Sequence, residues 1–289
     1  MDRAHEERSQ RTQAGIVRYE DVEGGCTRPP GPYGILSVPV DVLHLQSTAG
    51  NMSVAALLAS AATSGPNAVK IERNNADLEF TYEYPAQAAA IPTLDRRFRA
   101  EAAKEYQRHL KLGRIDKKSY RQEGRGSVTD FYSKVWSSAG ETPRLLSLQY
   151  QHGTYTGGAH PNTDYGALLW DRKLNREIAV SSLFLRASAF ATLTRPTYCK
   201  ALDREREKRR EGEKLDLPEF NACPKFGHLA ISPADSDNDA RFDTIAFVAS
   251  PYEAGPYAEG EYAIDVPVTS QLIAAIKPEY RSSFERHRQ

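Results

Sequence analysis

From residue 67 onward the chain alternates short strand-like runs with one long amphipathic run. Residues 69–72 and 78–84 alternate apolar and polar side chains, which is the period of a half-buried β-strand. Pro85 ends the second run because proline lacks the N–H that a strand uses for pairing. From Pro92 the apolar residues recur every four positions, which predicts a helix with one stripe against a sheet. The stripe comprises Leu94, Phe98, Ala102, Tyr106 and Leu110.

Glycines are expected to end this helix and to bound the polar connection that follows. Gly113 is the predicted end, and Gly124 and Gly126 lie farther along the connection. The next strand, residues 129–136, has apolar side chains on both faces, so both faces are expected to be covered. Phe131 and Val135 point to one side, and Tyr132 and Trp136 to the other.

Residues 144–155 and 163–170 predict a β-hairpin, because apolar residues share one face of each run. The segment between them carries Gly157-Gly158 and Pro161 and is expected to be a turn, since glycines accept positive φ and proline removes a donor. A short strand is expected at residues 177–180.

A helical stretch over residues 186–210 contains Pro196, which is expected to break it into two helices. Its end, residues 203–214, mixes both signs of charge and is interpreted as a solvated helix end, with Glu205 and Arg209 spaced to pair. Strands are expected at residues 241–250 and 262–268, on either side of a long loop.

Together these elements predict an α+β fold: a mostly antiparallel sheet with helices packed on one face, in two closely associated subdomains. The expected division is a disordered or leader-like segment at 1–66, an α+β domain at 67–140, a second α+β domain at 141–278, and a polar tail at 279–289.

Residues 52–66 are small and apolar and end in turn formers. They contain Ala59-Ser60-Ala61, a triplet of the type that signal peptidase accepts, which indicates a signal-peptide remnant. No Lys or Arg immediately precedes Met52, so an Ala-rich helix is the alternative. The hypothesis is that the native protein starts near Met52 or that its leader was lost from this gene model.

The composition permits a globular protein and argues against two kinds of partner. With 289 residues and 40% hydrophobic content, the chain can bury a core. The chain has 38 basic residues (Lys plus Arg) and 38 acidic residues (Asp plus Glu). It therefore has no net positive charge to attract a nucleic acid or an anionic membrane. The longest apolar stretch, residues 52–62, is far below the ~20 residues of a membrane-spanning helix. Neither nucleic-acid binding nor a transmembrane segment is expected.

The three cysteines, Cys26, Cys199 and Cys223, lack the spacing of a zinc site. Cys199 and Cys223 flank a charged segment, and a bridge between them would add about 3 kcal/mol on the chain-entropy model and imply an oxidising compartment. The alternative is two separate buried thiols. No role is assigned to Cys26.

Several patterns suggest chemistry without completing it. Gly157-Gly158 lacks the residues of a phosphate-binding loop. Asp235, Asp237 and Asp239 resemble the start of a calcium loop, but alanines stand where glycine and the last glutamate belong, which favours a surface turn. His152, His160 and Asp164 could form a metal or acid/base cluster, but surface histidines are the preferred interpretation. No catalytic set, metal or cofactor is expected.

The loop of residues 250–262 combines three tyrosines and three glutamates with glycine and proline. Tyrosine gives a large contact area at low entropic cost, and a stiff loop loses little freedom on binding, so the loop is a candidate interaction surface. The alternative is a structural corner whose tyrosines pack on the sheet.

Two separated motifs resemble a known family. The first is Tyr155-Thr156-Gly157-Gly158-Ala159-His160, followed by a strand and by Leu183-Phe184; the second is Pro251-Tyr252-Glu253-Ala254-Gly255-Pro256-Tyr257-Ala258. In this order they resemble the extracytoplasmic domain of lysozyme-sensing anti-sigma factors, domain of unknown function 3298. Residues 67–140 resemble the companion domain found at the N-terminus of some peptidoglycan deacetylases, domain of unknown function 4163. The likeness covers about residues 67–278.

The resemblance implies a secreted or lipid-anchored envelope protein, periplasmic or extracellular, that binds a lysozyme-like muramidase or peptidoglycan without catalysis. The anti-sigma factors add a sigma-binding segment and a membrane helix, which the sequence does not show, and no two histidines have the H-x-x-x-H spacing of the deacetylases. Signalling and deacetylation are therefore not carried over. The alternative function is a cell-wall glycan hydrolase or deacetylase that uses His152, His160 and Asp164. The predicted binding residues are Tyr155, His160, Tyr252, Glu253 and Tyr257.

Overall fold

The computed structural model describes residues 68–124, 126, 128–157 and 160–288. The leader-like segment at 1–66 and Cys26 lie outside these residues. None of the helices within them combines the length and apolar content that a membrane-crossing segment needs.

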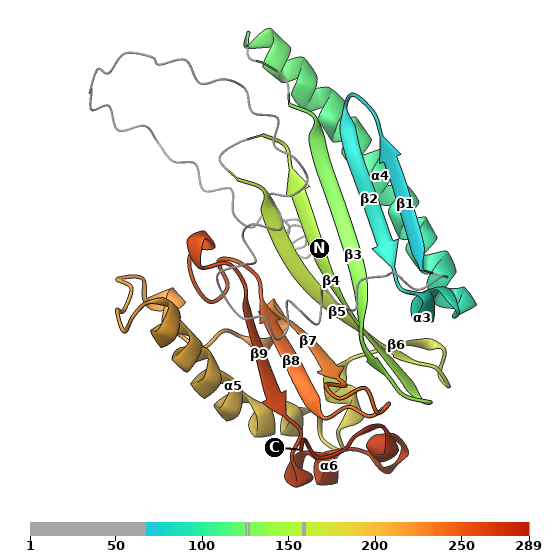
Figure 1. Cartoon of the computed structure of the whole chain (residues 1–289), viewed down its shortest axis with the longest axis vertical. Helices are drawn as coiled ribbons and strands as arrows, with labels where there is room; N and C mark the ends of the chain where they lie inside the picture. The colour runs from blue at the N-terminus through green and yellow to red at the C-terminus, as the bar shows by residue number, and fades with distance from the viewer. Residues whose placement is uncertain (1–67, 125, 127, 158–159, 289) are drawn as a thin grey trace, which may run out of the picture. The chain divides into compact units, whose positions relative to one another are not determined.

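Six strands form the larger sheet in their sequence order (Figure 1). All neighbouring pairs are antiparallel except β2 and β3, because the long helix α4 carries the chain back between them. The elements are β1 (Val69–Asn74), β2 (Leu78–Tyr84), α3 (Ala86–Ala89), α4 (Pro92–Gln122), β3 (Asp130–Glu141), β4 (Leu145–Tyr155), β5 (Asn162–Asp171) and β6 (Arg176–Ile178).

Three antiparallel strands form the second sheet, in the order β7-β8-β9. Its first strand, β7, contacts β3, β4 and β5 of the larger sheet, and α5 packs on β9. The elements are α5 (Ala187–Arg209), β7 (Leu229–Ala234), β8 (Thr244–Ala249), β9 (Tyr262–Pro267), α6 (Ser270–Ala275) and the short 3-10 helices η1 (Val180–Leu183), η2 (Pro218–Phe220), η3 (Phe226–His228), η4 (Tyr257–Glu259) and η5 (Pro278–Ser283).

Strand β4 contributes to two hydrophobic cores because successive side chains point to opposite faces. Leu146 and Leu148 join the core under α4, whereas Leu145 joins the core between the sheets and α5. These two cores confirm the predicted α+β fold with two closely associated subdomains. The expected domain boundary after residue 140 falls inside β3, just before its last residue Glu141, which pairs with Leu146 of β4 in the same sheet.

Two predicted helix breaks are absent from the structure. Gly113 does not end α4 but lies buried within it, where a Cβ would meet the carbonyl oxygen of Asp77 at 2.4 Å, so this glycine permits close packing. Pro196 does not divide α5, which runs unbroken from Ala187 to Arg209. Tyr198 and Leu202, two and six residues beyond the proline, are fully buried and hold the helix on the core.

A disulfide joins Cys199 of α5 to Cys223, with Cα atoms 5.5 Å apart. It confirms the predicted bridge and fastens the segment after α5 to the helix. The alternative of two free thiols is therefore wrong.

Candidate binding surface

The two connections that the sequence singled out meet in the structure. The ring of Tyr257, in the β8–β9 loop, stacks on the ring of His160, in the β4–β5 turn, with centroids 3.7 Å apart and an interplanar angle of 18°. The Tyr257 hydroxyl also donates to the carbonyl oxygen of Pro161 at 2.7 Å. His160, Tyr252 and Tyr257 form what we call the aromatic surface, since the Tyr252 ring lies 5.8 Å from that of Tyr257.

Tyr252 combines exposure with an uncommon backbone conformation. Its side chain is 56% exposed, and its φ of 74° lies in the left-handed region that disfavours side chains larger than glycine. Its N–H donates to the carbonyl of Gly255 at 3.0 Å, which closes a tight turn. Strained backbone positions cluster at functional sites, which makes this exposed tyrosine a candidate binding residue.

A hydrogen-bonded pair, His228 and Glu253, adjoins the aromatic surface. Nδ1 of His228, in the short helix before β7, lies 3.1 Å from Oε2 of Glu253, and both side chains contact solvent. Glu253 is thus available at the rim of the surface for a hydroxyl or a cation from a ligand.

The end of α5 supports the loop from beneath. Buried Arg206 donates to the carbonyl oxygens of Ala254 and Ala222 at 3.0 and 2.9 Å. Arg209 donates to the carbonyls of Glu259 and Glu261, both at 2.7 Å, and pairs with Glu205 at 3.0 Å as predicted. The interpretation of residues 203–214 as a solvated helix end is therefore wrong for these arginines.

Arg210 completes this support through Glu259. Its Nε and Nη2 each donate to the Glu259 carboxylate at 2.8 Å, and the Tyr262 hydroxyl donates to the same group at 2.5 Å. Burial by itself would raise the pKa of Glu259, but the hydrogen bonds from Arg210 and Tyr262 outweigh it and lower the pKa. The carboxylate therefore stays ionised and keeps the loop fixed.

The loop is also attached to the larger sheet. Ser250 Oγ donates to Oδ1 of Asp164 at 2.8 Å and accepts the N–H of Tyr165 at 3.1 Å. The β4–β5 turn is fastened in turn by Tyr120 of α4, whose hydroxyl donates to the carbonyl of Thr156 at 2.9 Å. Both connections that carry the aromatic surface are thus held by the sheet and helices below.

The structure places the five predicted binding residues in two groups. His160, Tyr252 and Tyr257 are joined by ring contacts, and Glu253 follows Tyr252 at the rim. Tyr155 is half-buried at the end of β4, opposite Phe131 of β3. Sequence reasoning missed His228 and the supporting arginines, whose partners lie far away along the chain.

The alternative catalytic residues are engaged in separate contacts. His152 lies beside Tyr132, with ring centroids 5.0 Å apart, and burial lowers its pKa. Asp164 is opposite His152 in the β4–β5 ladder but bonds Ser250, while His160 stacks on Tyr257. Within the described residues no hydrogen bond joins any two of these three side chains.

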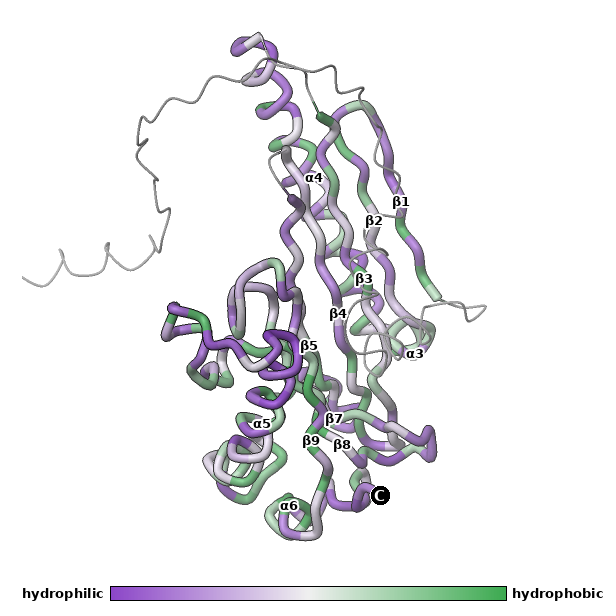
Figure 2. Tube along the Cα trace, turned by 60° about the vertical axis from the view of Figure 1, so that its left-hand side comes forward, coloured by the Kyte–Doolittle hydropathy of each residue, from purple (hydrophilic) through white to green (hydrophobic). Residues whose placement is uncertain are grey.

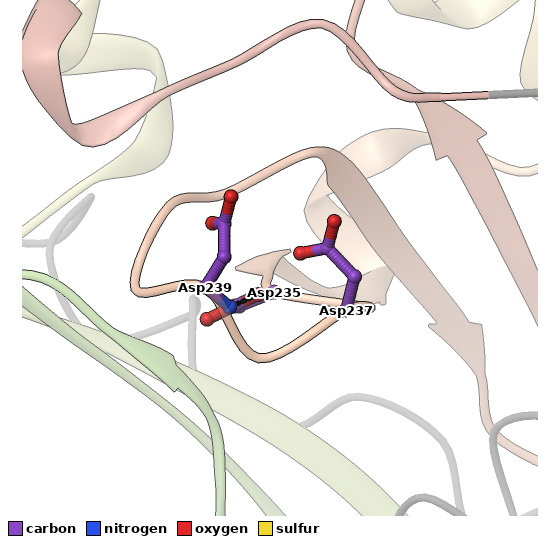
Figure 3. A group of neighbouring side chains, drawn as sticks. All are labelled: Asp235, Asp237 and Asp239. Atoms are coloured by element: carbon purple, nitrogen blue, oxygen red, sulfur yellow. Dashed lines mark hydrogen bonds between the residues drawn. The ribbon is translucent and has the colours of Figure 1, made fainter.

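The only group of acidic side chains with metal-ligand spacing among the described residues is Asp235, Asp237 and Asp239 (Figure 3). Asp235 already accepts the backbone N–H groups of Asp239 and Ala240 at 3.2 and 2.9 Å, and Arg288 lies 3.4 Å from Asp239. These contacts suit the predicted surface turn.

Residues 71–163 match the model of a family described as deacetylase PdaC. Similar solved structures include a member of the DUF3298 family from Bacteroides fragilis NCTC 9343, at 15% identity and a TM-score of 0.46, and a DUF3298 family protein from Pseudomonas aeruginosa PAO1, at 12% and 0.44. Each likeness covers 75% of this chain and 96% of the other. No curated protein matches the chain. The family match confirms the resemblance of the first domain to a domain of deacetylases predicted from the sequence.

Proposed function

We propose that this protein binds cell-wall glycan, without catalysis, through the aromatic surface of His160, Tyr252 and Tyr257. The observation that carries the proposal is Tyr252: a large ring, 56% exposed, at a backbone position with φ of 74°. Glycine would fit that backbone at lower cost, so the fold alone gives no reason for a tyrosine there.

Sugar rings suit such a surface because of their chemistry. The C–H groups on one face of a pyranose carry partial positive charge, whereas the faces of aromatic rings are negative. Hydroxyls at the sugar's edge would find Glu253 and His228 at the rim. Because arginines of α5 fix the loop beforehand, binding would cost little conformational entropy.

The proposal includes a periplasmic or extracellular location and lipid anchoring of the native precursor. Two further observations support the assignment to the cell envelope. The PdaC family match over residues 71–163 carries the name of a deacetylase family, in keeping with a glycan ligand. The Cys199–Cys223 disulfide suits an oxidising compartment.

A lysozyme-like muramidase is the second candidate ligand. Rigid, tyrosine-rich loops are also typical of protein-binding surfaces, and Glu253 offers a partner for a basic protein. The chain has a net charge of zero, however, and so lacks the acidic excess that would attract a basic protein.

Calorimetric titration of the purified chain with peptide-free glycan strands, with muropeptides and with lysozyme tests these candidates. If the proposal is correct, titration with glycan strands and with muropeptides should each give a measurable heat of binding. Heat with lysozyme alone would transfer the function to protein binding, and release of N-acetyl groups or reducing ends during incubation would show that the protein is an enzyme.

A further inference from the structure

The exposed face of α4 carries a row of cations that the proposed function does not use. From Lys104 to Arg121 the helix has a net charge of +5, although the whole chain is neutral. The seven basic residues are Lys104, Arg108, Lys111, Arg114, Lys117, Lys118 and Arg121, against Glu105 and Asp116. Figure 2 shows hydrophilic residues prevailing at this end of the helix.

Charge is segregated around the helix. At 3.6 residues per turn, Lys104, Arg108, Lys111 and Lys118 fall within roughly 80° of the circumference and extend about 21 Å along the axis. All four are exposed. The acids lie on the flank nearer the sheet, where Glu101 accepts a hydrogen bond from Lys134 at 2.5 Å. A basic row one or two side chains wide remains on the outer face.

Most of this charge is not neutralised within the described part of the chain. Lys104, Lys111, Lys118 and Arg121 form no ion pair there, whereas Arg108 pairs with Glu105 at 3.2 Å. The helix dipole stabilises cations only in the last turn, so it does not explain the positive charges at Lys104 and Lys111. Unpaired like charges at helical spacing repel one another, which makes an external anion the stabilising partner.

Two hollows mark where anionic groups would sit. One, of about 490 Å³, is lined by Arg114, Lys117, Lys118, Arg121, Gln122 and Asp77. The second, of about 270 Å³, shares Arg114 and Lys118 and adds Lys111. Asp77 is the one acid in the first hollow and is already paired with Lys117 at 3.1 Å and Arg114 at 3.5 Å.

We infer that this row binds a linear phosphate-linked polymer laid along α4. The anionic groups of such a polymer recur at intervals comparable to the roughly 5–6 Å between side chains one helical turn apart. The narrow row with acids on one flank fits a single extended chain better than a planar membrane. This inference concerns a different element from the aromatic surface and does not depend on the proposed function.

Long-chain inorganic polyphosphate, titrated into the full chain at several salt concentrations, tests the inference. The test variant carries Lys104→Gln, Lys111→Gln and Lys118→Gln. The matched control carries Lys173→Gln, Lys200→Gln and Lys214→Gln, which remove the same charge from exposed positions on other elements. Melting temperatures check that both variants fold.

The wild type and the control are expected to bind with an affinity that falls steeply from about 50 to about 200 mM salt. In the test variant the slope of log K against log salt should fall by about 2, since each lost contact with a single-stranded polyanion removes about 0.7. Equal weakening in both variants, or no binding by the wild type at about 50 mM salt, would overturn the inference. So would binding only to vesicles of phosphatidylglycerol.

Discussion

The ring of Tyr257 stacks on that of His160 at 3.7 Å, and this contact joins the β8–β9 loop to the β4–β5 turn. Tyr252 adjoins the pair with its ring 5.8 Å from Tyr257. Two connections far apart in sequence thus present one continuous aromatic surface, held from below by arginines of α5.

The variant Tyr252→Gly should separate stability from binding. Relief of the left-handed backbone is expected to raise the free energy of unfolding by about 1 kcal/mol, while glycan affinity falls because the exposed ring is gone. Tyr252→Ala keeps the backbone strain and is the control: it should lose the same affinity without the gain in stability. Denaturant unfolding and calorimetry measure the two effects, and a destabilised glycine variant would contradict the account of Tyr252.

Arg206→Met should destabilise the protein by about 3 kcal/mol. The substitution removes the donor to the carbonyls of Ala222 and Asn221 and the main donor to the buried Ala254. Arg204→Met, at an exposed position of the same helix, should change the free energy of unfolding by no more than about 0.5 kcal/mol. Similar losses in both variants, measured by urea denaturation, would show that Arg206 does not anchor the loop.

Removal of the disulfide should cost about 3 kcal/mol, as expected for closing a loop of 24 residues' separation. The double variant Cys199→Ala and Cys223→Ala should therefore melt at a lower temperature than the wild type. Adding reductant should lower the melting temperature of the wild type only. A response of the double variant to reductant would be inconsistent with this bridge as the redox-sensitive bond.

Asp130→Asn should stabilise the protein only toward neutral pH. Burial, with a smaller contribution from Asp116, raises the pKa of Asp130 to about 6, and its Oδ2 has no hydrogen-bond partner among the described residues. Because the folded state holds the proton more tightly than the unfolded state, whose pKa is about 3.9, wild-type stability falls as pH rises through this range. The melting-temperature difference between variant and wild type should grow from pH 4 to about 7.

The exposed Asp216→Asn, which removes the same charge from the surface, is the matched control for that experiment. A constant difference for Asp130→Asn across the same range would show that this carboxyl does not titrate near 6 in the folded protein.

The strands and the α4 stripe were predictable because side-chain alternation and helical periodicity are local properties. Strand β7 was not, since Pro233 argues against a strand; the proline is tolerated because β7 is an edge of its sheet. Gly113 suggested a helix end, but its role depends on Asp77, which belongs to another element.

The candidate site was predictable only in part. The tyrosines and His160 were selected from turn chemistry, but their contact depends on the fold. The arginines of α5 have the same local sequence whether they are solvated or buried. Their partners in the β8–β9 loop are carbonyls 44 to 52 residues away, as for Arg210 with Ala254 and Arg209 with Glu261.

The most direct test of the account is transfer of magnetisation between a glycan ligand and selectively labelled tyrosine rings in solution. The account predicts magnetisation transfer from the sugar C–H protons to the rings of Tyr252 and Tyr257. In the variant Tyr252→Gly, the signals to the Tyr257 ring should become weaker because the affinity falls. Glycan binding without contacts to either ring, or contacts of undiminished intensity in the variant, would contradict it.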